Sequence, residues 1–302
     1  MLYSDGHSNG RRNAKPNSIY FMSDLAYKTA GVINSLTLPT GVVNRSRSRR
    51  RPIDDPVKEP KGRELGERFS SVVDPSADPH INGEYLIKNP TWHVEYSEWK
   101  AQHIHGLLKR KNLHPRIVGE VGCGAGEVLR QLQLRLQPDC AFYGYDVAPP
   151  AIQLAQARAN ERLHFKLADF GVTESPRFDL LLVLEVVDHV EDCFGFLRML
   201  KGRGDWKIFS FSLDISAQNA LRRGALLRRR LDHSHLHHFS KETALAALEY
   251  SGYEVLDSFY PPGLAITPMA KLGKPLRRIL SAFGQDFAVR LLGGCSLMVL
   301  AR

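Results

Sequence analysis

The chain has 302 residues, of which 43% are hydrophobic and 24% charged, and its formal net charge is +9. These values are ordinary for a globular protein, and the length allows one large α/β domain with an extension, or two small domains. The four cysteines have no C-x-x-C spacing, which argues against a structural zinc site and a disulfide framework. No apolar run is long enough to span a membrane, and Arg11 and Arg12 lack the apolar region of an export signal. We therefore expect a cytoplasmic protein.

The composition changes near residue 80. Residues 1–80 are rich in Ser, Asn, Arg, Pro and Asp, and such stretches offer too little apolar surface to offset the entropy of ordering. We expect a flexible basic extension there and one folded domain over 81–302. Two insertions, at 214–236 and 261–294, interrupt that domain and have the pattern of amphipathic helices.

Strands and helices are expected to alternate along the folded domain. The predicted strands are 116–121, 141–146, 163–168, 178–185, 206–213, 253–259 and 295–300. The predicted helices run from an N-cap at Ser97 to the basic cluster 109–111, from about 128 to 136, over 151–160, over 193–201, and from an N-cap at Ser240 to Tyr250. The fourth strand is almost continuously apolar, as central parallel strands are. The alternation predicts a doubly wound, mostly parallel seven-stranded sheet.

A glycine-rich turn joins the first strand to the next helix. Its sequence is Glu120-Val-Gly122-Cys123-Gly124-Ala-Gly126. Glycine lets the backbone turn sharply and approach a ligand, and a nucleotide-like ligand then lies over the helix N-terminus. Dinucleotide enzymes also use such a turn, but their pattern needs a third glycine where this chain has Glu127.

The turn and three further strand ends resemble those of class I, Rossmann-like S-adenosylmethionine-dependent methyltransferases. In that family an acidic residue precedes x-Gly-x-Gly-x-Gly, and acidic residues end the next strands, as Asp146, Asp169 and Glu185 do here. The resemblance implies a methyltransferase that uses S-adenosylmethionine. It implies cofactor contacts at Glu120, Gly122, Cys123, Gly124, Gly126, Asp146, Val147, Asp169, Phe170 and Glu185. Trp92, Trp99 and Lys100 are expected to cover the cofactor, and core packing of the tryptophans stays open.

Histidines supply the candidate catalytic groups. His189 follows the fourth strand, and His238 follows the fifth, so both belong at the sheet edge that holds the cofactor. A hydroxyl acceptor benefits from a general base, and histidine titrates near neutral pH. The alternative for His189 is a packing role in its loop. No metal site is predicted, because the neighbouring histidines at 233, 235 and 237 have no companion cysteine or carboxylate in a recognisable spacing.

Basic residues bear on the partners. Arginines cluster at 45–51 and again at 222–230, and such patches favour anionic partners. We expect O-methylation of a small or medium-sized acceptor, such as an anionic or lipid-linked glycan. Carbon and nitrogen as acceptor atoms, and contact to a membrane surface, are left open. The alternatives are a nucleic-acid methyltransferase, for which no recognition module is visible, and a non-catalytic cofactor-binding protein of the same fold.

Overall fold

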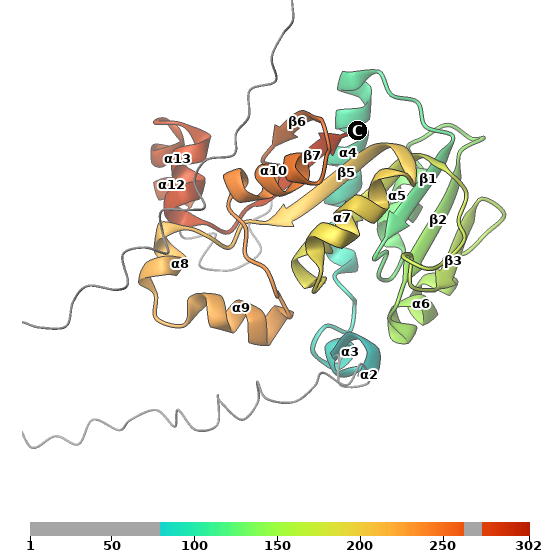
Figure 1. Ribbon diagram of the computed structural model, residues 1–302, viewed down its shortest axis with the longest axis horizontal. Coiled ribbons are helices and arrows are strands. Elements are labelled where there is room, and N and C mark those ends of the chain that lie inside the picture. The colour runs from blue at the N-terminus through green and yellow to red at the C-terminus, as the bar shows by residue number, and fades with distance from the viewer. Residues whose placement is uncertain (1–78, 263–273) are drawn as a thin grey trace, which may run out of the picture. The chain divides into compact units, whose positions relative to one another are not determined.

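The computed structural model describes residues 79–262 and 274–302, which belong to one compact unit. The predicted extension over 1–80 therefore lies almost entirely outside the described residues. The described part contains one seven-stranded sheet in the order β3-β2-β1-β4-β5-β7-β6 (Figure 1). The strands are β1 (Ile117–Val121), β2 (Ala141–Asp146), β3 (Leu163–Leu167), β4 (Phe178–Leu184), β5 (Gly204–Ser212), β6 (Val255–Phe259) and β7 (Ser296–Ala301).

The predicted fold class is confirmed. Strands β1 to β5 pair in parallel, and β7 runs antiparallel to both of its neighbours, β5 and β6. The sheet therefore reverses its winding at β1 and β4, where β1 pairs with β2 on one side and β4 on the other. In doubly wound sheets, ligands bind outside the carboxyl ends of the strands at this switch point.

Helices cover both faces of the sheet and fill the insertions. They are α2 (Pro79–Asn82), α3 (Glu84–Lys88), α4 (Ser97–Lys111), α5 (Glu127–Gln133), α6 (Pro149–Gln156), α7 (Cys193–Lys201), α8 (Ala217–Leu221), α9 (Ala225–His233), α10 (Lys241–Tyr250), α12 (Lys274–Ser281) and α13 (Gln285–Leu292). Two short 3-10 turns are η2 (Val94–Tyr96) and η3 (Val187–His189). As Figure 1 shows, α8, α9, α12 and α13 lie together on the left of the picture, on the side toward which β5 points.

The sheet is buried on both faces. On one face, Ile104 of α4, Leu129 of α5 and Ile152 of α6 join a core built on alternate residues of the strands. On the other face, Leu197 of α7 and Leu248 of α10 pack on the remaining strand residues, those that alternate with the first set. This double burial explains why β4 reads as an unbroken apolar run.

Local signals set several helix ends. Ser240 caps α10 in a reciprocal capping box with Thr243, as its sequence predicts. Ser97 does not cap α4, because the turn η2 runs directly into the helix and makes Ser97 its first residue. The helix predicted over 151–160 begins and ends earlier, since Pro149 and Pro150 occupy its first turn, where their fixed φ suits a helix.

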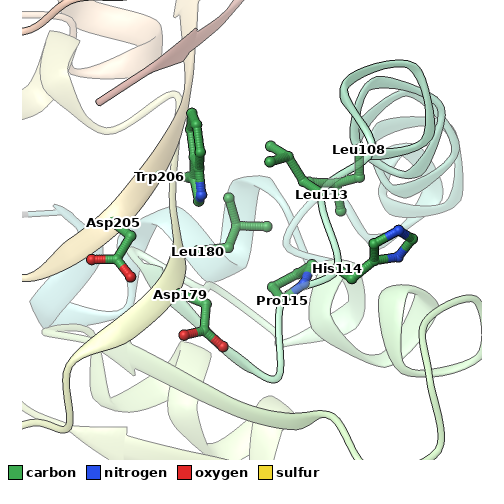
Figure 2. Close-up of a pocket in the computed structure, with 8 residues that line it drawn as sticks. All are labelled: Leu108, Leu113, His114, Pro115, Asp179, Leu180, Asp205 and Trp206. Carbon is green, nitrogen blue, oxygen red and sulfur yellow. The ribbon is translucent and has the colours of Figure 1, made fainter.

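A small cavity opens at the amino ends of β4 and β5. It has a volume of about 220 Å³, and Figure 2 shows its lining, which includes Asp179, Asp205 and Trp206. Asp179 accepts hydrogen bonds from the backbone N–H groups of Arg116 and Ile117, so its carboxylate stabilises the start of β1. This cavity lies at the sheet edge opposite the glycine-rich turn. Among residues 79–262 and 274–302, no helix has the length and apolar character needed to cross a membrane.

Candidate active site

The glycine-rich turn connects β1 to α5 at the switch point. Gly122, Gly124 and Gly126 have φ values of 69°, 54° and 76°, a left-handed region that strongly favours glycine. The backbone N–H groups of Gly122 and Cys123 both donate to the carbonyl of Tyr145, at 2.8 and 3.0 Å. These bonds fix the turn against the end of β2.

Asp146 holds the turn from the other side. Its Oδ2 accepts from the N–H of Gly124 at 2.8 Å, and its Oδ1 accepts from the N–H of Ala148 at 2.8 Å. Burial raises the pKa of Asp146, although the two backbone donors oppose that shift. The next residue, Val147, is 50% exposed at the same strand end. A carboxylate and an exposed apolar side chain thus stand at the carboxyl end of β2.

Glu120 is an acid buried in β1 without a partner for one of its oxygens. It is 2% exposed, and no described residue makes a hydrogen bond to Oε2. Burial raises the pKa of Glu120 to about 8, an effect that Lys100 opposes and Asp146 reinforces. A positively charged ligand group beside the turn would relieve this carboxyl group.

Substitution of Glu120 by glutamine is expected to stabilise the ligand-free protein at alkaline pH. The raised folded pKa of Glu120 means that wild-type stability declines as pH rises from about 4.5 to about 8. The glutamine variant does not titrate, so its free energy of unfolding should not show this decrease, which linkage puts on the order of 4 kcal/mol. Urea unfolding at pH 5.0 and pH 8.5, with the exposed Glu161→Gln as control, measures it. If the difference in unfolding free energy between variant and wild type is no larger at pH 8.5 than at pH 5.0, Glu120 does not have a raised pKa.

Lys100 and Glu185 form an ion pair beneath the site. Lys100, on α4, donates to Oε2 of Glu185 at 2.7 Å, and Ser296 of β7 donates to Oε1 at 3.0 Å. Glu185 has a φ of 58°, a strained conformation for a residue other than glycine. Each of its oxygens thus accepts a hydrogen bond from the protein, which ties Glu185 to α4 and to β7.

Aromatic side chains from the segment before α4 cover the turn. A Cβ atom on Gly124 would stand 2.7 Å from Cδ1 of Trp92, so the indole packs directly on the turn. Tyr85 and His80 continue the cluster, with ring centroids 5.0 and 6.3 Å from that of Trp92. Trp99 lies elsewhere, where its indole N–H donates to the carbonyl of Pro262 at 2.7 Å.

His189 stands on the loop that packs against the turn. In the same loop, the side chain of Val186 would lie 2.5 Å from a Cβ atom on Gly122. The Nδ1 of His189 is 3.2 Å from the carbonyl of Ser234, which assigns the proton to Nδ1 and leaves a lone pair on Nε2. Burial lowers the pKa of His189 to about 4, so the imidazole is neutral at pH 7.

His238 lies on the loop before α10. Its Nδ1 is 3.1 Å from Oδ2 of Asp214. His235, for which the sequence predicted neither a metal-binding nor a catalytic role, lies between the two predicted histidines. Its ring centroid is 5.0 Å from that of His189 and 6.5 Å from that of His238. Asp214 and His235 are 21 positions apart on irregular backbone, so no periodic pattern in the sequence links them.

The remaining predicted contacts occupy different environments. Asp169 is exposed at the end of β3, and its Oδ1 accepts from the N–H of Gly171. Phe170 is a core residue, 2% exposed, with its ring 5.1 Å from that of Tyr145. Cys123 is buried, and burial raises the pKa of its thiol far above the ordinary value.

Glu127, which occupies the place of a third glycine, has a structural role. Its carboxylate accepts from Arg130 and from Arg158, each at 2.7 Å. Hydrogen bonds from these groups lower the pKa of Glu127 to about 2 despite the opposing effect of burial. An ionised carboxylate at the first residue of α5 also suits the positive end of the helix dipole.

Comparison with known proteins supports a methyltransferase domain at the carboxyl ends of the strands. Residues 120–203 match the family model of a methyltransferase domain. A stretch of 88 residues is 40% identical to a ubiquinone biosynthesis O-methyltransferase of Azorhizobium caulinodans, and 84 residues are 36% identical to one of Methylobacterium sp.. Each match covers 26% of this chain and 32% of the relative, so the chain spans about a third of the length of these relatives.

Solved methyltransferase structures also resemble the chain. A magnesium protoporphyrin IX methyltransferase from Synechocystis with bound S-adenosylhomocysteine has 15% identity and a TM-score of 0.44, over 68% of this chain and 82% of its own. An S-adenosylmethionine-dependent methyltransferase from Aquifex aeolicus has 14% identity and a TM-score of 0.48, over 72% and 96%.

The family-model match begins at Glu120 and runs through the strands that form the switch point of the sheet. The cofactor of this family is S-adenosylmethionine. Residues 120–203 of this chain therefore match a methyltransferase domain, and the chain has the mostly parallel seven-stranded sheet of the class I methyltransferase fold.

Proposed function

We propose that this protein transfers the methyl group of S-adenosylmethionine to a hydroxyl oxygen of a small or medium-sized acceptor. The observation that carries the proposal is a neutral histidine, His189, on the loop that packs against the glycine-rich turn. The names of the relatives that share the matched stretch, O-methyltransferases, agree with an oxygen acceptor.

The residues around the turn fit the cofactor. The buried carboxyl group of Glu120, with Oε2 unpartnered among the described residues, suits the positively charged amino-acid end. Asp146 suits the ribose hydroxyls, because carboxylate oxygens that accept two N–H groups retain further lone pairs. We assign Asp169, which is exposed at the end of β3, to the adenine. The cofactor supplies an already activated methyl group, and the protein contributes binding, orientation and exclusion of water.

Deprotonation of the acceptor is assigned to His189. Its Nε2 carries the lone pair, and its neutral state at pH 7 leaves that atom able to accept a proton from a hydroxyl group. His238 is the second candidate, held by Asp214 on the neighbouring loop. Trp92 and Tyr85 would close the site against water, which strengthens charge interactions inside it.

Calorimetric titration of S-adenosylmethionine and S-adenosylhomocysteine tests the cofactor site. Wild-type protein is expected to bind both with micromolar affinity. Asp146→Asn should weaken binding about ten- to hundredfold, the effect of losing hydrogen bonds to a charged group. Lys166→Asn, an exposed change on β3, is the control. Binding of NAD alone, or equal affinity in both variants, contradicts the assignment.

The general base is tested by turnover with a panel of hydroxyl acceptors that includes anionic ones. His189→Gln should lower kcat by about 10²–10⁴-fold, the usual contribution of a positioned base, while cofactor affinity stays unchanged. A variant that keeps wild-type kcat on every hydroxyl acceptor removes His189 from the reaction. Methylation of amine acceptors only would contradict the oxygen assignment without affecting the cofactor site.

The insertions support an anionic, membrane-presented acceptor. The segments 217–233 and 274–292 carry nine basic residues against two aspartates. Apolar side chains stand exposed among these charges: Leu221 (87%), Leu231 (51%), Ile279 (61%) and Phe283 (77%). Basic helices with an exposed apolar face are suited to the surface of an anionic bilayer. We extend the proposal to an acceptor that is anionic or lipid-linked and reached at such a surface.

Vesicle cosedimentation tests this extension. The triple variant Arg222→Glu, Arg223→Glu and Arg228→Glu should lose more than about tenfold in affinity for phosphatidylglycerol-containing vesicles, since each basic residue contributes about 1 kcal/mol. The single Lys166→Glu change is the control for an exposed cation far from the insertions. Equal binding by triple variant and wild type, or binding to RNA with no binding to vesicles, overturns the membrane assignment.

A further inference from the structure

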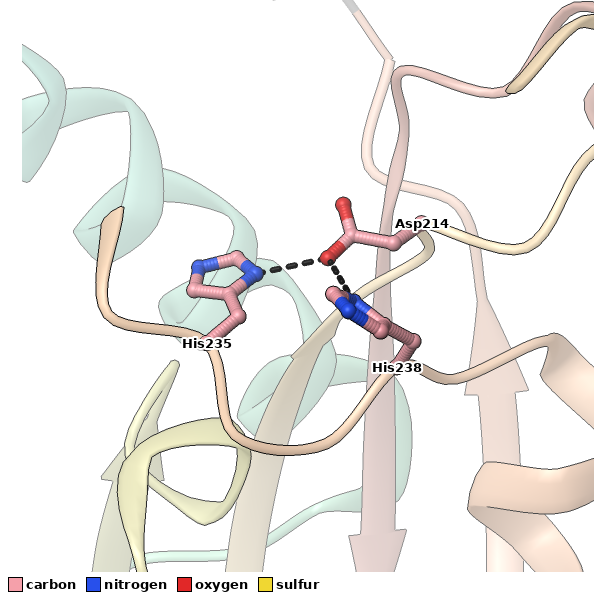
Figure 3. A group of neighbouring side chains, drawn as sticks. All are labelled: Asp214, His235 and His238. Atoms are coloured by element: carbon pink, nitrogen blue, oxygen red, sulfur yellow. Dashed lines mark hydrogen bonds and ion pairs between the residues drawn. The ribbon is translucent and has the colours of Figure 1, made fainter. Parts of the chain in front are cut away.

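Three buried or half-buried side chains converge beside the methyltransferase site. Asp214 follows β5, and His235 and His238 lie on the loop between α9 and α10 (Figure 3). The Nδ1 atoms of the two histidines point at the same oxygen, Oδ2 of Asp214, at 2.6 and 3.1 Å. One ligand atom from each residue lies within 4.8 Å of the other two. The side chains of Asp214 and His235 are only 4% and 8% exposed.

His235 lies between two carboxylates. Asp214 faces its Nδ1, and Oδ2 of Asp188 stands 4.0 Å from its Nε2. Asp188 is completely buried, and neither of its oxygens has a hydrogen-bond partner among the described residues. A neutral imidazole has a single N–H, so it can serve only one of these two acids.

A cation beside Asp214 would give both ring nitrogens of His235 a partner at once. Its charge is then shared by Asp214 Oδ2 and the lone pair of His235 Nδ1, while the proton of His235 resides on Nε2 and faces Asp188. A metal-bound histidine that directs its other N–H toward a carboxylate is the usual arrangement around protein metal sites. His238 adds a second imidazole nitrogen at the same point.

The donor set selects the ion. Two imidazole nitrogens and one carboxylate oxygen suit zinc, whereas magnesium and calcium prefer oxygen ligands alone. Zinc bonds of about 2.0–2.1 Å in a tetrahedron place neighbouring ligand atoms about 3.3 Å apart. The present separations of 2.6 and 3.1 Å thus have to open by less than ~1 Å. Arg229, 3.4 Å from the other oxygen of Asp214, opposes a cation and limits its affinity.

We propose that Asp214, His235 and His238 bind one zinc ion, with a fourth coordination position left to water or to an acceptor oxygen. This goes beyond methyl transfer, because a sulfonium methyl donor needs no metal to react. The sequence predicts no metal site, because the histidines at 233, 235 and 237 have no companion cysteine or carboxylate in a recognisable spacing. The fold supplies that acid from Asp214, at the end of the preceding strand.

Metal titration of the full chain, freed of metal by chelation and without methyl donor, tests the proposal. Zn²⁺ calorimetry should give one ion per chain, and Co²⁺ should produce the intense visible bands of a tetrahedral site. His235→Gln and His238→Gln should each weaken Zn²⁺ binding at least about tenfold. His233→Gln and His237→Gln, in the same loop but outside the cluster, should leave it unchanged. Near-ultraviolet circular dichroism of each metal-free variant verifies its fold.

Arg229→Gln provides a second, opposite readout. Removing its positive charge beside Asp214 should strengthen Zn²⁺ binding several-fold, an effect that adventitious binding by a histidine-rich loop would not show. Absence of one-to-one binding, or equal losses in all four histidine variants, overturns the site. Because zinc binding is measured without the methyl donor, its failure leaves the cofactor titration unaffected, and failure of the cofactor titration leaves the zinc result intact.

Discussion

Lys100→Met is expected to cost about 3 kcal/mol of folding stability, the lower end of the loss when one partner of a buried ion pair is removed, because this pair is only partly buried. Lys100 and Glu185 are 16% and 29% exposed, and their charges meet at 2.7 Å. The positive charge of Lys100 also faces Glu120 and Asp188. Methionine keeps most of the apolar stem, so the loss reports the charge. Urea unfolding at pH 7 measures it.

The double variant Lys100→Met with Glu185→Gln serves as the control. Neutralising Glu185 removes the unpaired charge, so the double variant should recover a large part of the stability lost in the single variant. A single variant as stable as wild type would show that Lys100 does not balance the acids of this edge. No recovery in the double variant would assign the loss to packing of the lysine stem instead.

Gly126→Val is expected to cost a similar amount, about 3–5 kcal/mol, and to abolish cofactor binding. A Cβ atom at Gly126 would stand 2.3 Å from Cζ of Phe165, an aromatic ring of the core. A β-branched residue is also strained at the φ of 76° found here. Overpacking and backbone strain each contribute about 1–3 kcal/mol. Thermal unfolding and calorimetric cofactor titration measure the two effects.

Gly202→Val is the matched control, since a Cβ atom at Gly202 meets nothing within 4 Å and its φ is −79°. The change should shift the melting temperature little. The double variant Gly126→Val with Phe165→Leu separates the two causes, because it relieves the collision but leaves the backbone strain. If Gly126→Val has the same melting temperature as Gly202→Val, the turn tolerates a side chain better than its geometry implies.

The fold was predictable because its signals are local. The apolar run at β4 and the glycine-rich turn after β1 each occupy fewer than ten consecutive residues, and burial on both faces leaves β4 no alternative pattern. The predicted helix starts are wrong where an adjacent residue or turn shifts the boundary. The turn η2 makes Ser97 the first residue of α4 instead of its cap, and Pro149 starts α6 two residues earlier than predicted. Local patterns place elements well and their ends less well.

The site was predictable only along the strands. The acid at Asp146 ends a predicted strand, so its place beside the turn followed from the topology. Lys100 and Glu185 are 85 positions apart, and the structure alone shows that they pair. The hydrogen bonds that tie Glu185 to α4 and β7 depend on contacts of this kind. Contacts between loops and distant helices have no period, so the sequence does not indicate them.

The position of β7 has a consequence for how the chain folds. β7 is synthesised after the other six strands, yet it lies between β5 and β6 and supplies Ser296 to Glu185. Until it is made, β5 presents an open edge, β6 has no strand to pair with, and one hydrogen bond beneath the cofactor site is missing. Open strand edges invite association between chains. We therefore expect a ribosome-bound chain that lacks β7 to depend on chaperones and to bind no cofactor.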